Sequence, residues 1–97
     1  MQGTGIRPEV IREIRDLARM YGVEKVVLFG SRARGDYHRV SDIDLAIMGG
    51  NKAAFALDVE EDTSTLLRFD IVDLDGQVQP ELLESIRREG RVIYEEV

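Results

Sequence analysis

The stretch FGSRARGDYHRVSDIDLAI, residues 29 to 47, combines features that neither a surface loop nor a core strand requires. It contains the pair Gly30-Ser31, then two arginines, and then two aspartates one residue apart, Asp42 and Asp44. An ordinary loop needs no such order, and a buried strand does not normally begin with two carboxylates because an unpaired buried charge is costly. The segment therefore predicts a chemical site next to a strand.

Strands are predicted on both sides of this segment. Four apolar residues, Val26 to Phe29, precede Gly30 and indicate a buried strand. From residue 42 onward, apolar and other residues alternate, which is typical of a second strand. Its two faces are Ile43, Leu45 and Ile47 on one side, and Asp42, Asp44, Ala46 and Met48 on the other.

The remaining elements follow from helical spacing, capping residues and alternation. Residues 8–21 begin with Pro8 and are followed by Gly22, and residues 79–90 have Pro80 near their start and end at Gly90. Both segments carry an apolar stripe, as amphipathic helices do. Residues 51–67 predict a third helix with Asn51 as its N-cap. Residues 68–75 alternate as a third strand, and residues 91–97 form either an edge strand or an extended tail.

The connections predict the sheet. Only about a dozen residues link Gly30 to Asp42, with a helical turn expected among them, which favours antiparallel pairing of the first two strands. The second and third strands are joined through a helix and should be parallel. We therefore expect an α/β fold with a small mixed sheet, helices on one face of it, and a single domain over residues 1–97.

Composition narrows the function. The chain has no cysteine, which excludes disulfides, thiolate metal sites and a cysteine nucleophile. A net charge of −6 argues against a large nucleic-acid footprint, whereas the local cluster Arg32, Arg34, His38 and Arg39 suits a small, highly charged ligand. Without an apolar run of roughly 20 residues or a secretory signal, the expected location is the cytoplasm, with no membrane contact.

The alternation of the strands selects a third acidic residue. Phe69 and Ile71 extend the apolar face that the helices should cover. If the second and third strands are neighbours in register, Asp70 then joins Asp42 and Asp44 on the opposite face. Asp73 has the other parity and cannot join them within a regular strand.

Three carboxylates gathered in this way predict a metal site. Without a cation they repel one another and raise their own pKa values. Carboxylate oxygens without nearby Cys or His ligands favour Mg²⁺ or Mn²⁺ over zinc. Two side chains on the same face of a strand can bridge a pair of ions about 3.5–4 Å apart. Gly30 and Ser31 end the preceding strand beside them, at a junction suited to the oxygens of a nucleoside triphosphate.

The complete pattern resembles a known family. Gly30-Ser31, ten intervening residues and Asp42-Ile43-Asp44 match the signature of the DNA polymerase beta-like nucleotidyltransferase superfamily. Together with the later FDIVDL, the chain is most similar to the minimal, MntA-type nucleotidyltransferases. The resemblance implies a polymerase beta palm-like fold with the order α-β-α-β-α-β-α.

The resemblance also implies roles for the matching residues. Asp42 and Asp44 would hold two Mg²⁺ ions, and Asp70 would bind the catalytic ion and help to deprotonate the attacking hydroxyl. Gly30 and Ser31 would hold the β- and γ-phosphates of ATP. From the residues alone, Arg34 either contacts phosphate or pairs with Asp36 or Asp42; Arg32 is a further candidate phosphate contact.

Two further polar residues of this segment, His38 and Ser41, also have to be interpreted. Ser41 is a candidate nucleotide-binding residue that either caps or orients the Asp pair. His38 has no Cys or other His beside it and is interpreted as a loop residue.

Family members commonly pair with a helical HEPN protein that acts as an RNase toxin. The resemblance implies that this chain is the antitoxin and transfers AMP from ATP to a hydroxyl of that partner, in a homo- or hetero-oligomer. Two alternatives stay open. The chain could neutralise its partner by occlusion alone, without catalysis, or it could modify a small hydroxyl-bearing antibiotic.

Overall fold

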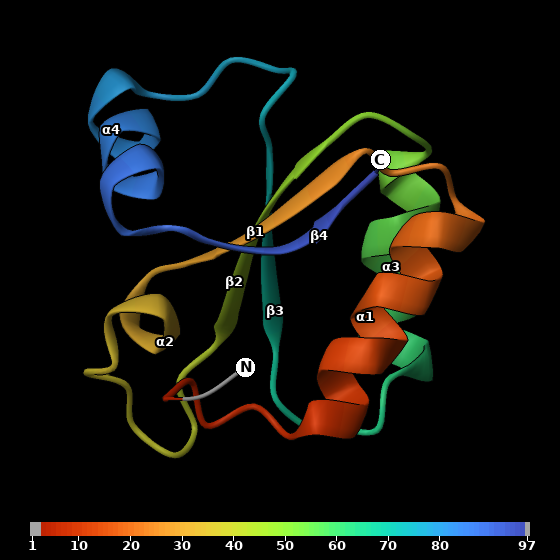
Figure 1. Cartoon of the computed structure of the whole chain (residues 1–97), viewed down its shortest axis with the longest axis horizontal. Coiled ribbons are helices and arrows are strands. Elements are labelled where there is room, and N and C mark those ends of the chain that lie inside the picture. The colour runs from red at the N-terminus through yellow and green to blue at the C-terminus, as the bar shows by residue number, and fades with distance from the viewer. Residues whose placement is uncertain (1–2, 97) are drawn as a thin grey trace.

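A four-stranded sheet with the order β3-β2-β1-β4 lies at the centre of the computed structural model, which describes residues 3–96 (Figure 1). Its strands are β1 (Lys25–Phe29), β2 (Ile43–Met48), β3 (Phe69–Asp73) and β4 (Arg91–Glu95). β1 pairs antiparallel with β2 and β4, and β2 pairs parallel with β3. The mixed sheet is thus confirmed, and the segment after residue 90 forms an edge strand rather than a tail.

Residues 3–96 also form four helices, of which the first precedes β1 and the other three connect consecutive strands: α1 (Pro8–Met20), α2 (Ser31–Arg34), α3 (Lys52–Asp62) and α4 (Pro80–Glu89). α2 is the predicted helical turn between β1 and β2. The predicted N-cap of α3 is also present, because the Asn51 side chain accepts a hydrogen bond from the Ala54 N–H at 3.2 Å. α3 ends earlier than predicted, which leaves residues 63–68 as a loop before β3.

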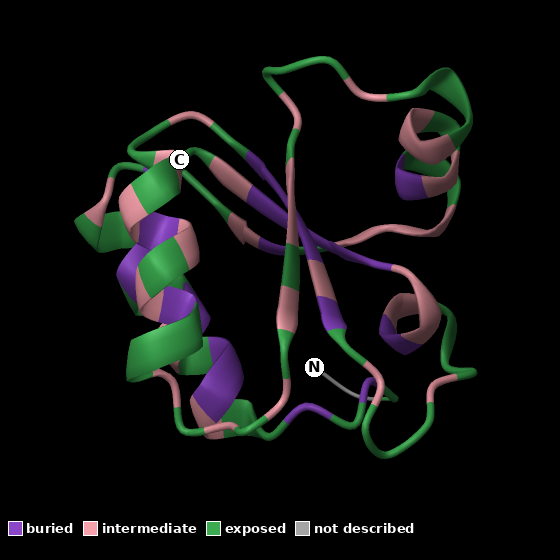
Figure 2. Cartoon of the chain, turned by 180° about the vertical axis from the view of Figure 1, so that it is seen from behind, coloured by how far each residue is buried: buried purple, intermediate pink, exposed green. Residues whose placement is uncertain are grey.

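α1 and α3 cover one face of the sheet and enclose the main core (Figure 2). The buried side of α1 is the apolar stripe seen in the sequence, and Ile43, Leu45 and Ile47 supply the facing surface of β2. Burial of these side chains is the main stabilising term of the fold. Phe69 and Ile71 pack against the same cluster, as their parity predicted.

α4 lies on the opposite face of the sheet, so the expectation of helices on one face needs correction. A second cluster there combines Val27, Phe29, Ala46 and Ile86. The physical reason lies in β1, whose consecutive apolar residues project to both sides of the sheet and require cover on both. α4 covers this face only in part, leaving a cavity of about 460 Å³ between α4 and the far ends of β1 and β2.

None of the helices within residues 3–96 is both long and apolar enough to cross a lipid bilayer.

Candidate active site

Strand register brings the three predicted carboxylates to one end of the sheet. Asp44 is the direct partner of Asp70 in the parallel β2-β3 ladder and of Phe29 in the antiparallel β1-β2 ladder. Neighbouring strands are about 4.8 Å apart, so Asp44 and Asp70 stand side by side. Asp42 lies just before β2 and is exposed. All three are on the face that carries α4 rather than the face that carries α1 and α3.

The carboxylates affect one another electrostatically. Partial burial, followed by the charges of Asp70 and Asp42, raises the pKa of Asp44 from 3.8 to about 6. The positive charges of Arg34 and Arg32 act in the opposite direction but do not cancel this effect. Burial is the largest cause of the shift, and the smaller contributions of Asp70 and Asp42 agree with the strand register, which places these carboxylates at the same end of the sheet.

Among the described residues, no cation forms an ion pair with this cluster. Within residues 3–96, neither Asp42, Asp44 nor Asp70 forms an ion pair with a lysine or arginine. Carboxylate oxygens with uncompensated charge are the ligands that Mg²⁺ and Mn²⁺ prefer, so the donor set fits such ions.

The described part of the chain nevertheless contains no three acidic or His side chains grouped as a ready-made metal cage. Mutual repulsion keeps like charges apart when no cation is present. Binding a metal here therefore requires the carboxylates to turn toward a common point.

Gly30 closes the site from the β1 side, and only glycine fits there. Its φ of 75° lies in a region that other residues rarely adopt. A Cβ atom at this position would lie 2.2 Å from Oδ2 of Asp44, well inside the contact distance. The backbone at the end of β1 therefore lies directly against the Asp44 carboxylate.

The turn that follows offers free backbone donors. The Gly30 carbonyl accepts hydrogen bonds from the N–H groups of Ala33 and Arg34, both at 3.1 Å. The N–H groups of Ser31 and Arg32 donate to no backbone carbonyl among residues 3–96. They are available, together with the Ser31 hydroxyl, to the oxygens of a phosphate chain.

Arg32 has a structural role that the sequence did not reveal. Its side chain is only 1% exposed and donates hydrogen bonds to the carbonyls of Thr4 at 2.8 Å, Ser41 at 3.0 Å and Arg39 at 3.2 Å. The guanidinium also lies over the Tyr37 ring, 4.8 Å from its centre. It is therefore engaged in holding the loop before β2 and is not presented to phosphate. No pattern in the sequence distinguishes it from Arg34.

Arg34 and Ser41 lie beside the cluster but have partners within the chain. Arg34 is exposed and pairs with Asp36 at 3.2 Å and Glu89 at 3.0 Å, and both contacts raise the pKa of its guanidinium. The pairing with Asp36 was one of the two sequence alternatives. The Ser41 hydroxyl accepts a hydrogen bond from the His38 N–H at 2.8 Å, which closes a turn. Nucleotide contact by either residue stays a prediction.

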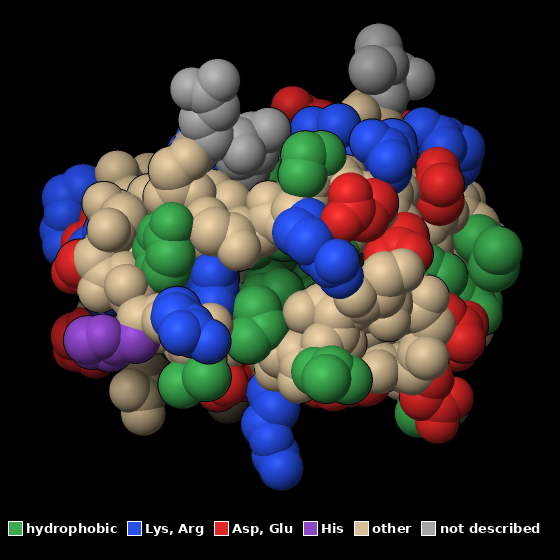
Figure 3. Space-filling view, turned by 90° about the horizontal axis from the view of Figure 1, so that it is seen from below, with side chains coloured by type: hydrophobic (Ala, Val, Ile, Leu, Met, Phe, Trp, Pro, Cys, Tyr) green, Lys and Arg blue, Asp and Glu red, His purple; other side chains and the backbone are tan. Residues whose placement is uncertain are grey.

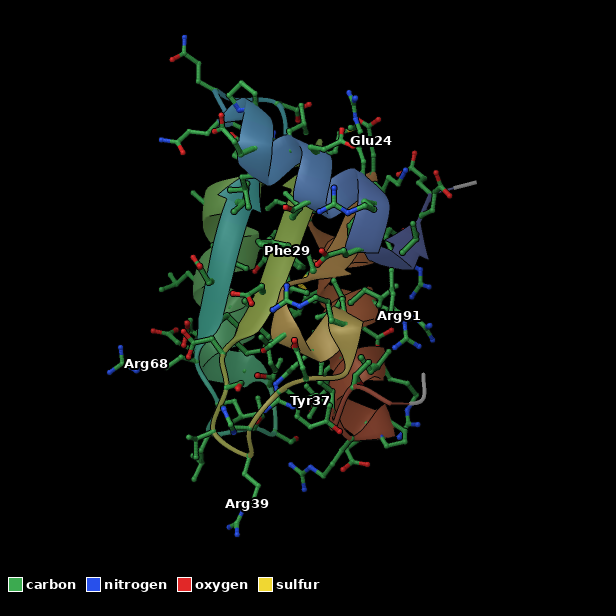
Figure 4. The ribbon with its side chains drawn as sticks, turned by 90° about the vertical axis from the view of Figure 1, so that its left-hand side faces the viewer. Glu24, Phe29, Tyr37, Arg39, Arg68 and Arg91 are labelled. Carbon is green, nitrogen blue, oxygen red and sulfur yellow. The ribbon has the colours of Figure 1, made fainter. Side chains whose placement is uncertain are left out.

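The side chains at this end can be followed in Figure 4, where Phe29 lies on the strand that leads to Gly30. Arg39 and Arg68 extend outward from the loops that precede β2 and β3. His38 is exposed, in agreement with its interpretation as a loop residue.

Comparison with known proteins identifies the family. The profile of the family described as "Polymerase beta, Nucleotidyltransferase" matches residues 12–97. The chain therefore belongs to the polymerase beta-type nucleotidyltransferases, and it is an enzyme of that class. Its resemblance to the minimal members of the class is also confirmed.

A curated protein of Methanocaldococcus jannaschii, named "Putative protein adenylyltransferase MJ0604", is 35% identical over 82 residues, covering 74% of this chain and 79% of that protein. A solved structure described as "Crystal structure of the toxin-antitoxin with AMP-PNP" superposes with a TM-score of 0.72 at 23% identity, covering 89% of this chain and 73% of the other. A mutant form of the toxin-antitoxin MntA-HpeT gives a TM-score of 0.71 at 22% identity, with the same two coverages. These two structures establish the likeness of fold.

Proposed function

We propose that this chain transfers AMP from ATP to a hydroxyl group of a partner protein, and that it is the antitoxin of a toxin-antitoxin pair. The observation that carries the proposal is the cluster of Asp42, Asp44 and Asp70, which has no cationic partner among residues 3–96 and lies against Gly30. The name of the Methanocaldococcus jannaschii relative and the descriptions of the two structural neighbours support the protein acceptor and the paired partner.

In the proposed reaction, an oxygen of the acceptor hydroxyl attacks the α-phosphorus of ATP. A new P–O bond forms, the bond between the α-phosphorus and the pyrophosphate oxygen breaks, and pyrophosphate leaves. Asp70 is exposed at the end of the cluster and would accept the proton of the hydroxyl. Most of the rate enhancement in such phosphoryl transfers comes from positioning and from stabilising charge.

The other site residues hold the triphosphate. The free N–H groups that follow Gly30 and the Ser31 hydroxyl would donate to the β- and γ-phosphate oxygens. Asp42, Asp44 and Asp70 would hold two Mg²⁺ ions, which neutralise phosphate charge and orient the reacting groups when bound. Arg34 lies within reach of the acidic cluster and would exchange its contact with Glu89 for a phosphate oxygen.

The partner in this proposal is a helical HEPN-type protein in the same cytoplasm, and the acceptor is a hydroxyl on its surface. A single experiment tests transfer. The chain is incubated with the protein encoded beside its gene, Mg²⁺ and ATP labelled on the α-phosphate, and the partner is then examined for label. Transfer that requires Mg²⁺ supports the proposal, and absence of label on a partner that demonstrably binds the chain argues against it.

The double variant Asp42→Asn with Asp44→Asn separates catalysis from simple occlusion. Both substitutions preserve side-chain size but remove the charges that bind metal, so the variant should fold and fail to transfer AMP. If it still neutralises the toxic partner as well as the wild type does, neutralisation works by occlusion and the catalytic part of the proposal is wrong.

A further inference from the structure

The two edges of the sheet are protected to different degrees. At the β4 edge, Arg15 of α1 donates a hydrogen bond of 2.6 Å to the Ile93 carbonyl. The register of β4 with β1 also shifts, between Val26 and Val27. Covering side chains and such irregularities keep an edge strand from pairing with another chain. β3, at the other margin of the sheet (Figure 4), pairs with β2 without a shift, so β3 is the edge suited to a further strand.

The backbone of β3 directs alternate residues away from β2. Hydrogen bonds of 2.8 Å join Arg68 and Leu74, which flank β3, to the backbone of β2. Backbone groups alternate in direction along a strand, so Asp70 and Val72 also face β2. The residues of the other parity are Phe69, Ile71 and Asp73, and their N–H and C=O groups point outward from the sheet.

Only part of this outward row has partners within residues 3–96. Glu60 of α3 accepts a hydrogen bond of 3.0 Å from the Phe69 N–H. The Asp73 carbonyl accepts one of 3.2 Å from the Gly76 N–H, in the turn that follows β3. Ile71 lies between them, and in the described part of the chain its N–H and its carbonyl have no hydrogen-bond partner. A free donor and a free acceptor on one residue match the main chain of an added strand.

The side chains of β3 are also incompletely covered. None of its five residues is fully buried, although Phe69, Ile71 and Val72 are apolar and pack against the two cores. Most residues of β2 are buried, by contrast. The end of the molecule at which β3 begins shows hydrophobic, basic and acidic side chains intermixed, without one broad surface of a single kind (Figure 3). The half-covered strand edge is therefore the feature that a partner would recognise there.

An added strand would lie directly beside Asp70, the proposed proton acceptor. In an antiparallel pair, Ile71 would form a hydrogen-bonded pair, and Asp70 and Val72 would fall at non-hydrogen-bonded positions, where facing Cα atoms are only about 4.5 Å apart. The side chains of Asp70 and Val72 lie on the face that carries α4. A residue opposite Asp70 would thus point its side chain to the acidic cluster, and the residue two positions before it would pack on Val72.

We propose that β3 binds the acceptor protein as an added antiparallel strand, with the hydroxyl residue opposite Asp70 and an apolar residue, two positions earlier, opposite Val72. This inference rests on the proposed function and adds to it the conformation and sequence pattern of the acceptor. The main chain of the segment provides affinity, and its alternating side chains select the hydroxyl. A second copy of the chain fits less well. Pairing of two β3 strands about Ile71 would place Asp70 opposite Val72 and Asp73 opposite Phe69, so charged side chains would face apolar ones.

Peptides with altered backbones test main-chain pairing directly. A short fluorescent peptide carries a central tyrosine, isoleucine two positions before it, and threonine or lysine elsewhere. One version is N-methylated on the residue just before the tyrosine, whose N–H would donate to the Ile71 carbonyl. A matched version is N-methylated on the isoleucine, whose N–H would point to solvent. Fluorescence anisotropy with the full chain, without nucleotide, should show about tenfold weaker binding for the first version only, because its methyl group removes a backbone hydrogen bond and enters the ladder.

Amide hydrogen exchange and a pair of valine variants locate the bound peptide. In the free protein the Ile71 amide should exchange fast, whereas the Val72 amide, which faces β2, should be protected. Bound peptide should slow exchange at Ile71 and leave Ile93, at the other edge, unchanged. Val72→Ser should weaken peptide binding, whereas Val92→Ser should not, although Val92 lies on the same face of the sheet beside Val27.

Equal effects of the two methylations, no measurable binding of the unmodified peptide, or unchanged exchange at Ile71 would overturn the inference. Exchange at Ile71 that slows in the free protein as its concentration rises would overturn it in favour of a second copy. Transfer of labelled AMP separates the inference from the proposed function. Peptide binding with the expected pattern but without transfer to peptide or partner contradicts the reaction and supports strand pairing. Equal transfer to both methylated peptides supports the reaction and contradicts strand pairing.

Discussion

Asp44→Asn should stabilise the metal-free protein while it destroys the site. Asp44 is partly buried, lies beside Asp70 and forms no ion pair within residues 3–96, so its charged form is unfavourable in the folded state. Asparagine has nearly the same shape and carries no charge. The change removes repulsion without creating a cavity, which is the expected behaviour of a residue kept for function at a cost in stability.

The size of the effect follows from the pKa. A rise from 3.8 to about 6 corresponds to roughly 3 kcal/mol of unfavourable free energy at neutral pH, and solvent screening of a partly exposed group reduces this to about 1–2 kcal/mol. Because the folded state binds the proton more tightly than the unfolded state, this group lowers the free energy of unfolding as pH rises from about 4 to about 6. The loss of unfolding free energy caused by the Asp44 charge is complete at pH 7 and absent below pH 4.

Chemical denaturation of wild type and Asp44→Asn in buffer with chelator, at several pH values from 4 to 8, measures this directly. At pH 7 the variant should be more stable by about 1–2 kcal/mol, a rise in melting temperature of some 4–8 °C per kcal/mol for a domain of this size. The gap should close toward pH 4. Mg²⁺ with ATP should stabilise only the wild type, because ligands that bind the folded state shift the equilibrium toward it. A variant less stable than wild type at pH 7, or a difference in stability that does not change with pH, would show that the charge of Asp44 does not destabilise the fold.

Three further substitutions test separate parts of the structure. Gly30→Ala should lower the free energy of unfolding by about 1–3 kcal/mol and abolish ATP binding, because the backbone conformation is strained for alanine and the new Cβ meets Asp44. Thermal unfolding measures the first effect and calorimetric titration with ATP the second. Normal ATP affinity would contradict the close approach of the Gly30 backbone to Asp44. Arg32→Met should destabilise the protein by about 3 kcal/mol in denaturation curves, since buried carbonyls lose their hydrogen-bond donor. Unchanged stability would mean that the guanidinium does not organise the loop before β2. Phe55→Ala should lower the free energy of unfolding by about 3–5 kcal/mol in denaturation curves but leave AMP transfer per folded molecule unchanged. A selective loss of AMP transfer would show that α3 takes part in the site.

Local patterns were sufficient for most of the fold. The strict alternation of β2 and β3 assigns their faces, and the lengths of the connections give the directions of the strands. Parity alone separates Asp70 from Asp73, and the structure agrees: Asp70 is the register partner of Asp44, whereas Asp73 lies 3.8 Å from Lys52. The proximity of the three acidic residues could therefore be predicted without coordinates.

Features that depend on tertiary arrangement could not be predicted. The four apolar residues of β1 are buried on both faces, but no residue of α4 indicates which face it will cover. The burial of Arg32 depends on carbonyl groups of Thr4 and of the loop before β2, which converge only when the chain is folded.

Binding of magnesium-ATP to matched variants of β3 is the most direct test of a metal site shared by Asp42, Asp44 and Asp70. Calorimetric titration would compare wild type, Asp70→Asn and Asp73→Asn with ATP in the presence and absence of Mg²⁺. Both substitutions remove one exposed carboxylate from the same strand, but only Asp70 faces Asp44. Asp70→Asn should lose the magnesium-dependent part of the affinity for ATP, whereas Asp73→Asn should keep it. Equal affinity of Asp70→Asn and wild type for magnesium-ATP would contradict a shared site of the three aspartates.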